Sequence, residues 1–171
     1  ESGDGWGHVK PLCNMELIAS SRAQVAVAED GPLRTVFEIT RSFELPEELL
    51  FTGTVNAMFG GTALSEHTRI LRIVSRITLD KDSPELQVCT VLYNNIRDCR
   101  LRLCISTGIH GEYFTSQAFV FLNRTPGRES GYATQEFRET EPVEKNFNGL
   151  AGKRDARGGI ALISDTGFFG S

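Results

Sequence analysis

The chain has 171 residues, with 18 Lys and Arg against 22 Asp and Glu, and a formal net charge of −4. A chain of this length can bury a substantial core and fits one domain. The basic residues form no stripe of the kind that marks a nucleic-acid interface. No apolar run reaches the length of a membrane span. We therefore expect a globular protein with neither nucleic acid nor a membrane as its partner.

The sequence begins with Glu1-Ser2-Gly3-Asp4 rather than Met, so we interpret it as a piece excised from a longer protein. Its four cysteines show no CxxC spacing. We expect buried free thiols in a reducing, cytoplasmic setting, although a disulfide between neighbouring strands stays open. A zinc site built from the cysteines alone is not expected, because metal-ligand spacings are lacking. The cysteines are Cys13, Cys89, Cys99 and Cys104.

Alternating apolar and polar residues predict strands in the first half of the chain. Ala23–Glu29 and Leu33–Phe43 alternate on either side of the turn signal at 30–32, which favours a hairpin. Thr68–Asp80 is a third candidate strand, followed by a turn to Pro84. Residues 46–68 give a weak pattern, with either a short helical turn at Glu47-Glu48 or extended chain at 51–55. One face of the candidate strands is expected to hold Leu33, Thr35, Phe37, Ile39 and Phe43, and Leu71, Ile73, Ile77 and Leu79.

The stretch Leu86–Ser106 carries the clearest pattern. It reads as two strands joined by a polar turn at 94–98, and in the second strand aliphatic residues alternate with arginines. A strand with one apolar and one charged face is typical of an antiparallel sheet that is wetted on one side. The apolar set is Leu101, Leu103 and Ile105, and the other set is Arg100, Arg102 and Cys104.

The second half of the chain also favours strands. We predict strands at Thr115–Asn123 and Ala133–Arg138, and a short buried strand at Gly159–Asp165. Glu139–Lys145 is expected to be charged and exposed, and Gly149–Gly159 to be a flexible loop. No segment shows sustained helical periodicity. These patterns together predict an all-β fold, an antiparallel β-sandwich that forms a single domain over residues 1–171.

Four segments, taken in order, resemble the β-sandwich region of glycoside hydrolase family 38, the α-mannosidases. Asn94-Asn95 followed by Arg100-Leu101-Arg102 is similar to a family pattern in which His usually stands where this chain has Cys99. The resemblance rests on the shared order of segments rather than on one motif. The segments are Ser2–Pro11 (SGDGWGHVKP), Asp30–Thr35 (DGPLRT), Leu92–Gly108 and Gly158–Phe168 (GGIALISDTGF).

The resemblance implies a parent enzyme that hydrolyses α-mannosides with retention, using zinc and an aspartate nucleophile. Those groups belong to an N-terminal catalytic domain with a His-x-Asp motif. None of His8, His67 and His110 is followed two positions later by Asp. The resemblance therefore predicts a non-catalytic domain with no catalytic residue, no metal ligand and no cofactor of its own. It implies a partial supersandwich like that of galactose mutarotase, which supports the catalytic domain.

The resemblance also suggests partners and a contact site. The partners would be the rest of the parent α-mannosidase chain, an α-mannoside and, in a homo-oligomer, further copies. The segment with Asp4, Trp6 and His8 is predicted to contact carbohydrate, since an indole face complements a pyranose ring and the polar pair can bond hydroxyls. The alternative is that Trp6 packs on the sheet.

Other polar residues support weaker hypotheses. His110 and Glu112 could act as an acid and base pair, but flanking glycines favour a solvated loop. Arg100 and Arg102 could bind an anion, or could pair with the acidic 139–144 segment, which we favour.

Two alternative functions stay open. One is a free-standing mutarotase-like aldose epimerase, which would draw on His67 or His110 with Glu66 or Glu112. The other is a carbohydrate-binding module that depends on Trp6.

Overall fold

The computed structural model describes residues 22–51, 62–99, 101, 103–124, 145–164 and 168–170. Within these ranges every regular element is a β-strand, and every strand pair is antiparallel. The predicted all-β, antiparallel fold class is therefore confirmed. The described residues fall into two compact units that divide between Leu101 and Arg102, and each unit is described by itself. The single domain over residues 1–171 stays a prediction.

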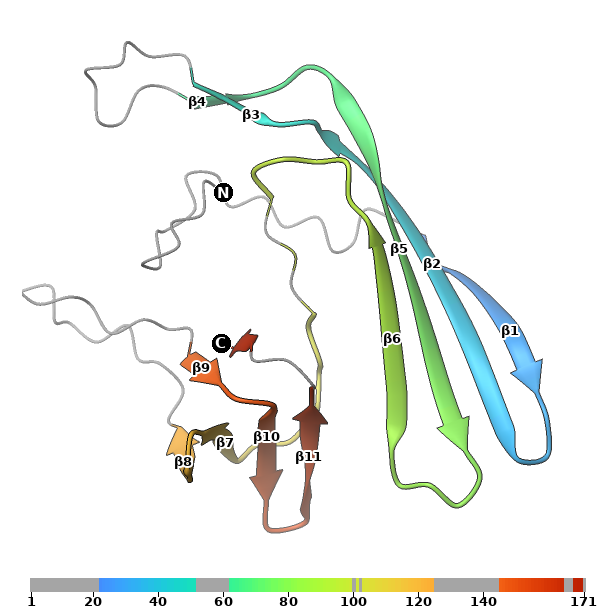
Figure 1. Ribbon diagram of the computed structural model, residues 1–171, viewed down its shortest axis with the longest axis vertical. Helices are drawn as coiled ribbons and strands as arrows, with labels where there is room; N and C mark the ends of the chain where they lie inside the picture. Colours follow the sequence, from blue (N-terminus) through green and yellow to red (C-terminus); the bar gives the residue numbers. More distant parts are fainter. Residues whose placement is uncertain are drawn as a thin grey trace, which may run out of the picture. The chain divides into compact units, whose positions relative to one another are not determined.

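The first unit is built on a four-stranded sheet with the order β1-β2-β5-β6 (Figure 1). The hairpin predicted for the first two strands is confirmed, and the predicted strand at 68–80 agrees with β5 residue for residue. The strands are β1 Gln24–Asp30, β2 Arg34–Pro46, β5 Thr68–Asp80 and β6 Leu86–Tyr93.

The register places apolar side chains on one face of this sheet. Phe37 lies opposite Ile77 and Phe43 opposite Leu71, and opposite residues share a face. The predicted phase of these strands is thereby confirmed. Two hydroxyls on this face, Ser75 Oγ and Thr90 Oγ1, bond each other at 2.9 Å. We call the following set the apolar face: Val25, Val27, Phe37, Ile39, Phe43, Leu71, Ile73, Ile77, Leu79, Leu86, Val88 and Leu92.

The opposite face of the same sheet is polar. Arg76 Nε lies 2.9 Å from Glu38 Oε2 across the β2–β5 pair. The guanidinium of Arg72 lies 5.7 Å from the ring centroid of Tyr93 on β6. Exposed pairs of this kind stabilise a fold only slightly, so their main effect is to make this face compatible with water.

The buried residues of this unit gather at one end of the sheet. There the short strands β3 Leu49–Phe51 and β4 Thr62–Leu64 continue the β2–β5 ladder. The loop after β6 crosses the same end, because Arg97 N donates to Glu47 O at 2.8 Å. The helical turn predicted at Glu47-Glu48 is wrong, since these residues form a bend before β3. The buried residues are Ser65, Leu71 and Ile96.

The main correction to the predicted strands concerns the segment at 100–106. Leu101 and residues 103–110 form no strand, and Leu103 is 69% exposed. The reason lies in the loop at 94–98, where Asn94 Oδ1 accepts from Ile96 N at 2.9 Å. Asp98, in the left-handed region with φ 54°, accepts from Leu49 N at 3.2 Å. The Asn94 bond shapes the loop from within, and the Asp98 bond attaches it to the β3 end of the unit instead of returning the chain along β6.

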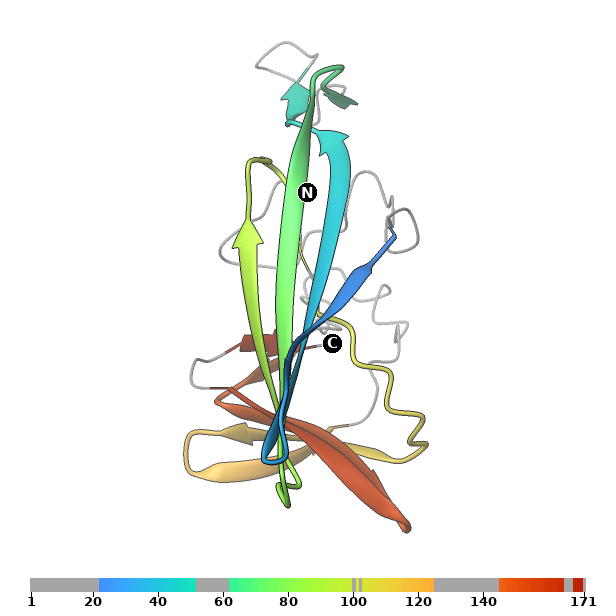
Figure 2. The same ribbon diagram turned by 90° about the vertical axis from the view of Figure 1, so that its right-hand side faces the viewer.

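The second unit contains a four-stranded sheet with the order β11-β10-β7-β8 and a two-stranded ladder of β9 and β12 (Figure 2). Among its described residues Thr115 and Phe147 are buried. Ser116 joins the two ladders, because its backbone carbonyl accepts from Asn148 N at 2.8 Å. The strands are β7 Glu112–Gln117, β8 Val120–Arg124, β9 Lys145–Phe147, β10 Leu150–Asp155, β11 Gly158–Ile163 and β12 Phe168–Gly170.

The structure corrects two predictions about strand limits in this unit. The single strand predicted at 115–123 is a hairpin, because Phe119 takes up a φ of 69° and turns the chain between β7 and β8. The loop predicted at 149–159 is mostly strand β10. Gly152 permits this close pairing, since a Cβ there would lie 2.4 Å from Phe114 Cζ and 2.6 Å from Ile160 O.

The last predicted strand lies at the edge of the β11-β10-β7-β8 sheet. The strand predicted at 159–165 is confirmed as β11 at 158–163, but it is exposed rather than buried, with Ile163 at 70%. The predicted strand at 133–138 and the charged segment at 139–144 lie outside the described residues.

Candidate functional sites

The predicted carbohydrate contacts lie outside the part of the chain that the structure describes. This holds for Asp4, Trp6 and His8, and equally for Arg100 and Arg102. The hypotheses on these residues therefore stay predictions.

An open hollow in the second unit brings together one of the predicted pairs. One wall consists of His110, Gly111 and Glu112, the first residue of β7. The other wall contains Asp155, the last residue of β10, and Ala156 in the turn that follows. A Cβ on Gly111 would lie 1.9 Å from the backbone oxygen of Arg154, so the approach of these two segments requires glycine.

Arg154 is the central polar side chain of this hollow. Its Nη2 lies 3.6 Å from Glu112 Oε2 and donates to Asn123 Oδ1 at 3.5 Å. Its guanidinium also lies 5.6 Å from the ring centroid of Phe114. Among the described residues no hydrogen bond joins His110 to Glu112, and both are exposed. The arrangement therefore favours the solvated loop over an acid and base pair, and Arg154 is the group best placed to bond a hydroxyl or an anion.

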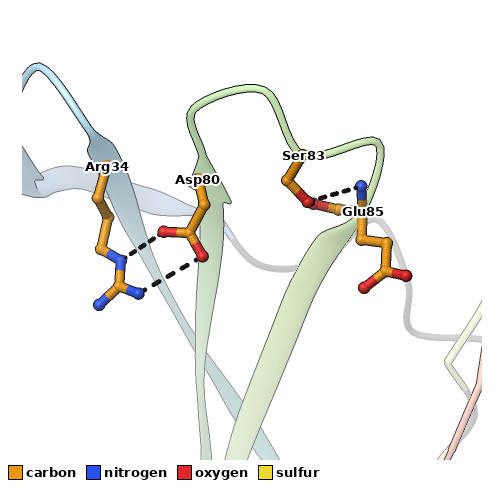
Figure 3. Close-up of polar contacts among 4 residues, drawn as sticks. All are labelled: Arg34, Asp80, Ser83 and Glu85. Carbon is orange, nitrogen blue, oxygen red and sulfur yellow. Dashed lines mark hydrogen bonds and ion pairs between the residues drawn. The ribbon is translucent and has the colours of Figure 1, made fainter.

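A second polar cluster lies where two hairpin turns of the first unit meet (Figure 3). Arg34 on β2 donates two hydrogen bonds to Asp80 at the end of β5, from Nε to Oδ1 at 2.6 Å and from Nη2 to Oδ2 at 3.4 Å. Lys81 N donates to Leu33 O at 2.8 Å, and Glu85 N donates to Ser83 Oγ at 3.1 Å. This cluster fixes both turns and has no arrangement of a nucleophile and a base.

The Arg34–Asp80 pair gives stability a defined pH dependence. The hydrogen bond from Arg34 lowers the pKa of Asp80, against a smaller opposing effect of desolvation. A carboxyl group whose pKa is lower in the folded than in the unfolded state stabilises the fold at pH values above its unfolded pKa of about 3.9. This stabilisation is lost as the pH falls through the folded-state pKa. We expect Asp80→Asn to lower the melting temperature slightly at pH 7, and the difference to narrow as the pH falls below about 4.

The measurement is thermal unfolding from pH 7 to pH 2.5, with Asp82→Asn as the matched control. Asp82 lies in the same turn with a φ of 60°, which Asn accepts, and no described ion pair involves it. The control removes the same charge and should leave the melting temperature unchanged. Equal effects of the two variants, or a gap that does not narrow between pH 7 and pH 2.5, would refute the role given to Asp80.

The cysteines and histidines of the described residues form no metal centre. Cys89, Cys99 and Cys104 are free thiols as predicted, but they are exposed, so the burial predicted for these three is wrong. Cys13 lies outside the described residues. Within the described ranges no three His, Cys, Asp or Glu side chains lie together as metal ligands. His67 is exposed, and its backbone N donates to Ser65 Oγ at 3.1 Å while its carbonyl accepts from Glu47 N. The backbone of His67 thus helps to hold the β4–β5 junction.

Sequence reasoning did not identify Arg154 or the Arg34–Asp80 pair. Arg154 and Glu112 are opposite residues of β10 and β7, which lie about forty positions apart in the chain. Arg34 and Asp80 are likewise opposite residues, of β2 and β5. The sequence did contain a hint of the second pair. Arg34 begins one strand and Asp80 ends another of the same length, so antiparallel pairing of the two places these opposite charges side by side.

The fold of this chain is similar to that of two solved structures. One is an α-mannosidase from Enterococcus faecalis V583, with a TM-score of 0.70 and 17% identity over 85% of this chain and 16% of that chain. The other is a protein in glycosyl hydrolase family 38 from Enterococcus faecalis, with a TM-score of 0.63 and 18% identity over 85% of this chain and 19% of that chain. The family resemblance found in the sequence is therefore confirmed at the level of the fold.

The likeness has defined limits. This chain spans less than a fifth of the length of either protein, and identity of this order shows a shared fold alone. No family model matches the sequence. No curated protein matches it either. Among the described residues no helix is long and apolar enough to cross a membrane.

Proposed function

We propose that this chain is a non-catalytic β-sandwich domain of a family 38 α-mannosidase. The observation that carries the proposal is the fold match, which covers 85% of this chain but at most 19% of the two larger proteins. When most of a chain matches only a small part of a larger enzyme, the chain is best explained as one domain of a similar enzyme. Cleavage of the α-mannoside then belongs to another domain of the parent protein.

The polar clusters of the described residues support this division of work. Arg34 pairs with Asp80 and Arg154 pairs with Glu112, and neither pair provides a nucleophile with a base. The described residues also bring no three zinc ligands together, so they do not fit the metal that the family uses. We derive no step through zinc, and in this proposal its ligands lie in the catalytic domain.

The supporting role rests on the apolar face of the first unit. Val25, Val27, Leu86 and Val88 on it are each more than half exposed. Exposed apolar side chains gathered on one face of a sheet mark a surface that packs against other protein. We propose that the rest of the parent enzyme is its partner, in a cytoplasmic enzyme of mannose metabolism.

A carbohydrate contact is the second part of the proposal. Asp4, Trp6 and His8 would border the substrate cleft of the parent enzyme, with Trp6 stacked on a sugar ring. Titration calorimetry of the 171-residue chain with an α-mannoside should give heat that Trp6→Ala abolishes and Phe119→Ala does not. Equal heats for both variants would remove Trp6 from the site.

The principal experiment is an assay of the purified chain on an aryl α-mannoside with added zinc. We expect no turnover above background, because the catalytic groups are proposed to lie on another domain. Zinc-dependent turnover that a chelator removes would contradict the proposal. Turnover of aldose anomers that His110→Ala abolishes would instead favour the epimerase alternative.

A further inference from the structure

One serine of the second unit holds both sides of the turn between β9 and β10. The backbone carbonyl of Ser116 on β7 accepts a hydrogen bond from Asn148 N at 2.8 Å. The Ser116 hydroxyl donates to the Asn148 carbonyl oxygen, with Leu150 O at 3.2 Å as an alternative acceptor, and accepts from Leu150 N at 3.1 Å. Asn148 is therefore bonded through its backbone N–H and its carbonyl to the same residue.

The residue between these fixed positions is Gly149, so the turn contains an Asn-Gly pair, which occurs once in the chain. Gly149 has a φ of 77°, in the left-handed region, and its carbonyl accepts from Ser164 N at 2.7 Å. Among the described residues no bond uses the Gly149 N–H. Asparagine is thermolabile in proteins, and a following glycine has no side chain to screen its backbone nitrogen.

We propose that Asn148 is a site of spontaneous deamidation and that Ser116 controls the rate of this reaction. The Gly149 nitrogen attacks Asn148 Cγ, the bond from Cγ to Nδ2 breaks, and the Gly149 amide proton leaves with Nδ2 as ammonia. Water then opens the five-membered succinimide at either of its carbonyl groups, which leaves aspartate or isoaspartate at position 148. The reaction consumes water, releases ammonia and involves no oxidation or reduction.

The native turn opposes ring closure. The succinimide ring joins the Cα, Cβ, Cγ and carbonyl carbon of Asn148 to the Gly149 nitrogen, and its near-planar form sets the rotation about the Asn148 Cα–C bond. Ser116 bonds the backbone groups on either side of that rotatable bond, the N–H and the carbonyl. Intramolecular reactions need their atoms in a near-attack arrangement, so a turn that cannot rotate reacts slowly.

Deamidation at this turn changes the second unit permanently. Isoaspartate lengthens the main chain between position 148 and Gly149, so Leu150 no longer returns to the Ser116 hydroxyl at the native spacing. Both products also place a negative charge directly after Phe147, one of the buried residues of the unit. The reaction therefore marks chains whose β9–β10 turn has opened.

The first experiment compares the wild-type chain in its native state and in guanidinium chloride, at one pH and temperature. Mass spectrometry of the digested protein follows deamidation of the peptide that contains positions 148 and 149. Because the fold holds the turn closed, we expect the unfolded chain to react about tenfold faster or more. Equal rates in the two states would overturn the proposal, and so would an unreactive Asn148 in the unfolded chain.

The second experiment measures the native rate in three variants. Ser116→Ala removes the hydroxyl bonds, so we expect its rate to rise about threefold or more, the effect of losing one hydrogen bond. Ser116→Thr keeps the hydroxyl and should react at the wild-type rate. Thr115→Ala is the matched control, because it removes the neighbouring hydroxyl of β7, which accepts from Arg124 Nε at 3.2 Å and does not contact Asn148.

The control variant should also react at the wild-type rate. Equal acceleration by Ser116→Ala and Thr115→Ala would mean that general destabilisation of β7 sets the rate, and would refute the role given to Ser116. A wild-type rate in Ser116→Ala, or a Ser116→Thr chain as fast as Ser116→Ala, would refute it as well.

Discussion

Replacement of Leu71 by alanine is expected to lower the free energy of unfolding by about 2–5 kcal/mol, the range for truncation of a fully buried leucine. Leu71 is 1% exposed and lies on the apolar face opposite Phe43. The surrounding β3–β4 ladder and the loop at 94–98 are held by backbone hydrogen bonds, so the structure cannot easily collapse into the cavity. Urea unfolding followed by far-ultraviolet circular dichroism measures the change.

Leu86→Ala is the matched control for this prediction. Leu86 lies on the same face but is 63% exposed, so its truncation leaves no cavity. We expect a cost of under about 1 kcal/mol for this variant. Equal costs for the two leucines would mean that the buried end of the sheet is not its stabilising core.

Replacement of Gly111 by alanine is expected to destabilise the second unit by about 1–3 kcal/mol or more, the usual cost of overpacking. The added Cβ would lie 1.9 Å from the Arg154 backbone oxygen and 2.7 Å from its carbonyl carbon. Backbone cannot move aside as a side-chain end can, so the β7–β10 pairing must open. Hydrogen exchange of the amides of β7 and β10 locates the change.

Gly31→Ala provides the comparison for Gly111. A Cβ on Gly31 would meet its nearest atom, Arg34 O, at an ordinary 3.4 Å. We expect this variant to change stability by less than about 0.5 kcal/mol. If Gly111→Ala is tolerated equally well, the hollow around Arg154 is not held by that close contact.

The strands that could be predicted from the sequence are those with a strict period of two over many residues. Strands β2 and β5 are thirteen residues long and show this pattern, and the turns at 30–32 and 80–84 join β2 to β1 and β5 to β6. A slip of one residue would move every apolar side chain to the wrong face, so the pattern determines the register as well.

The same pattern wrongly predicted a strand at 100–106. Leu101, Leu103 and Ile105 alternate as well as any strand, but a strand also needs a partner. Asn94 bonds Ile96 within the preceding loop, and Asp98 attaches that loop to β3 instead. Such side-chain bonds leave no trace in a hydrophobic pattern. The strand at β10 was missed for the converse reason, since its glycine suggested a loop but instead allows Phe114 to approach.

The candidate sites were harder to predict than the fold because they depend on pairing between distant segments. Arg154 meets Glu112 and Asn123 only because β10 pairs with β7 and β7 with β8. The charges themselves gave no hint of these partners. Asp4, Trp6 and His8, in contrast, lie close together in the sequence, so the family resemblance could indicate them without knowledge of the strand pairing.

The proposal that this chain is one domain of an α-mannosidase is tested most directly by sequencing the coding DNA that adjoins its 171 codons. The account predicts one open reading frame that continues upstream into a domain with a His-x-Asp motif. A frame that closes immediately on both sides, without such a domain, would contradict it.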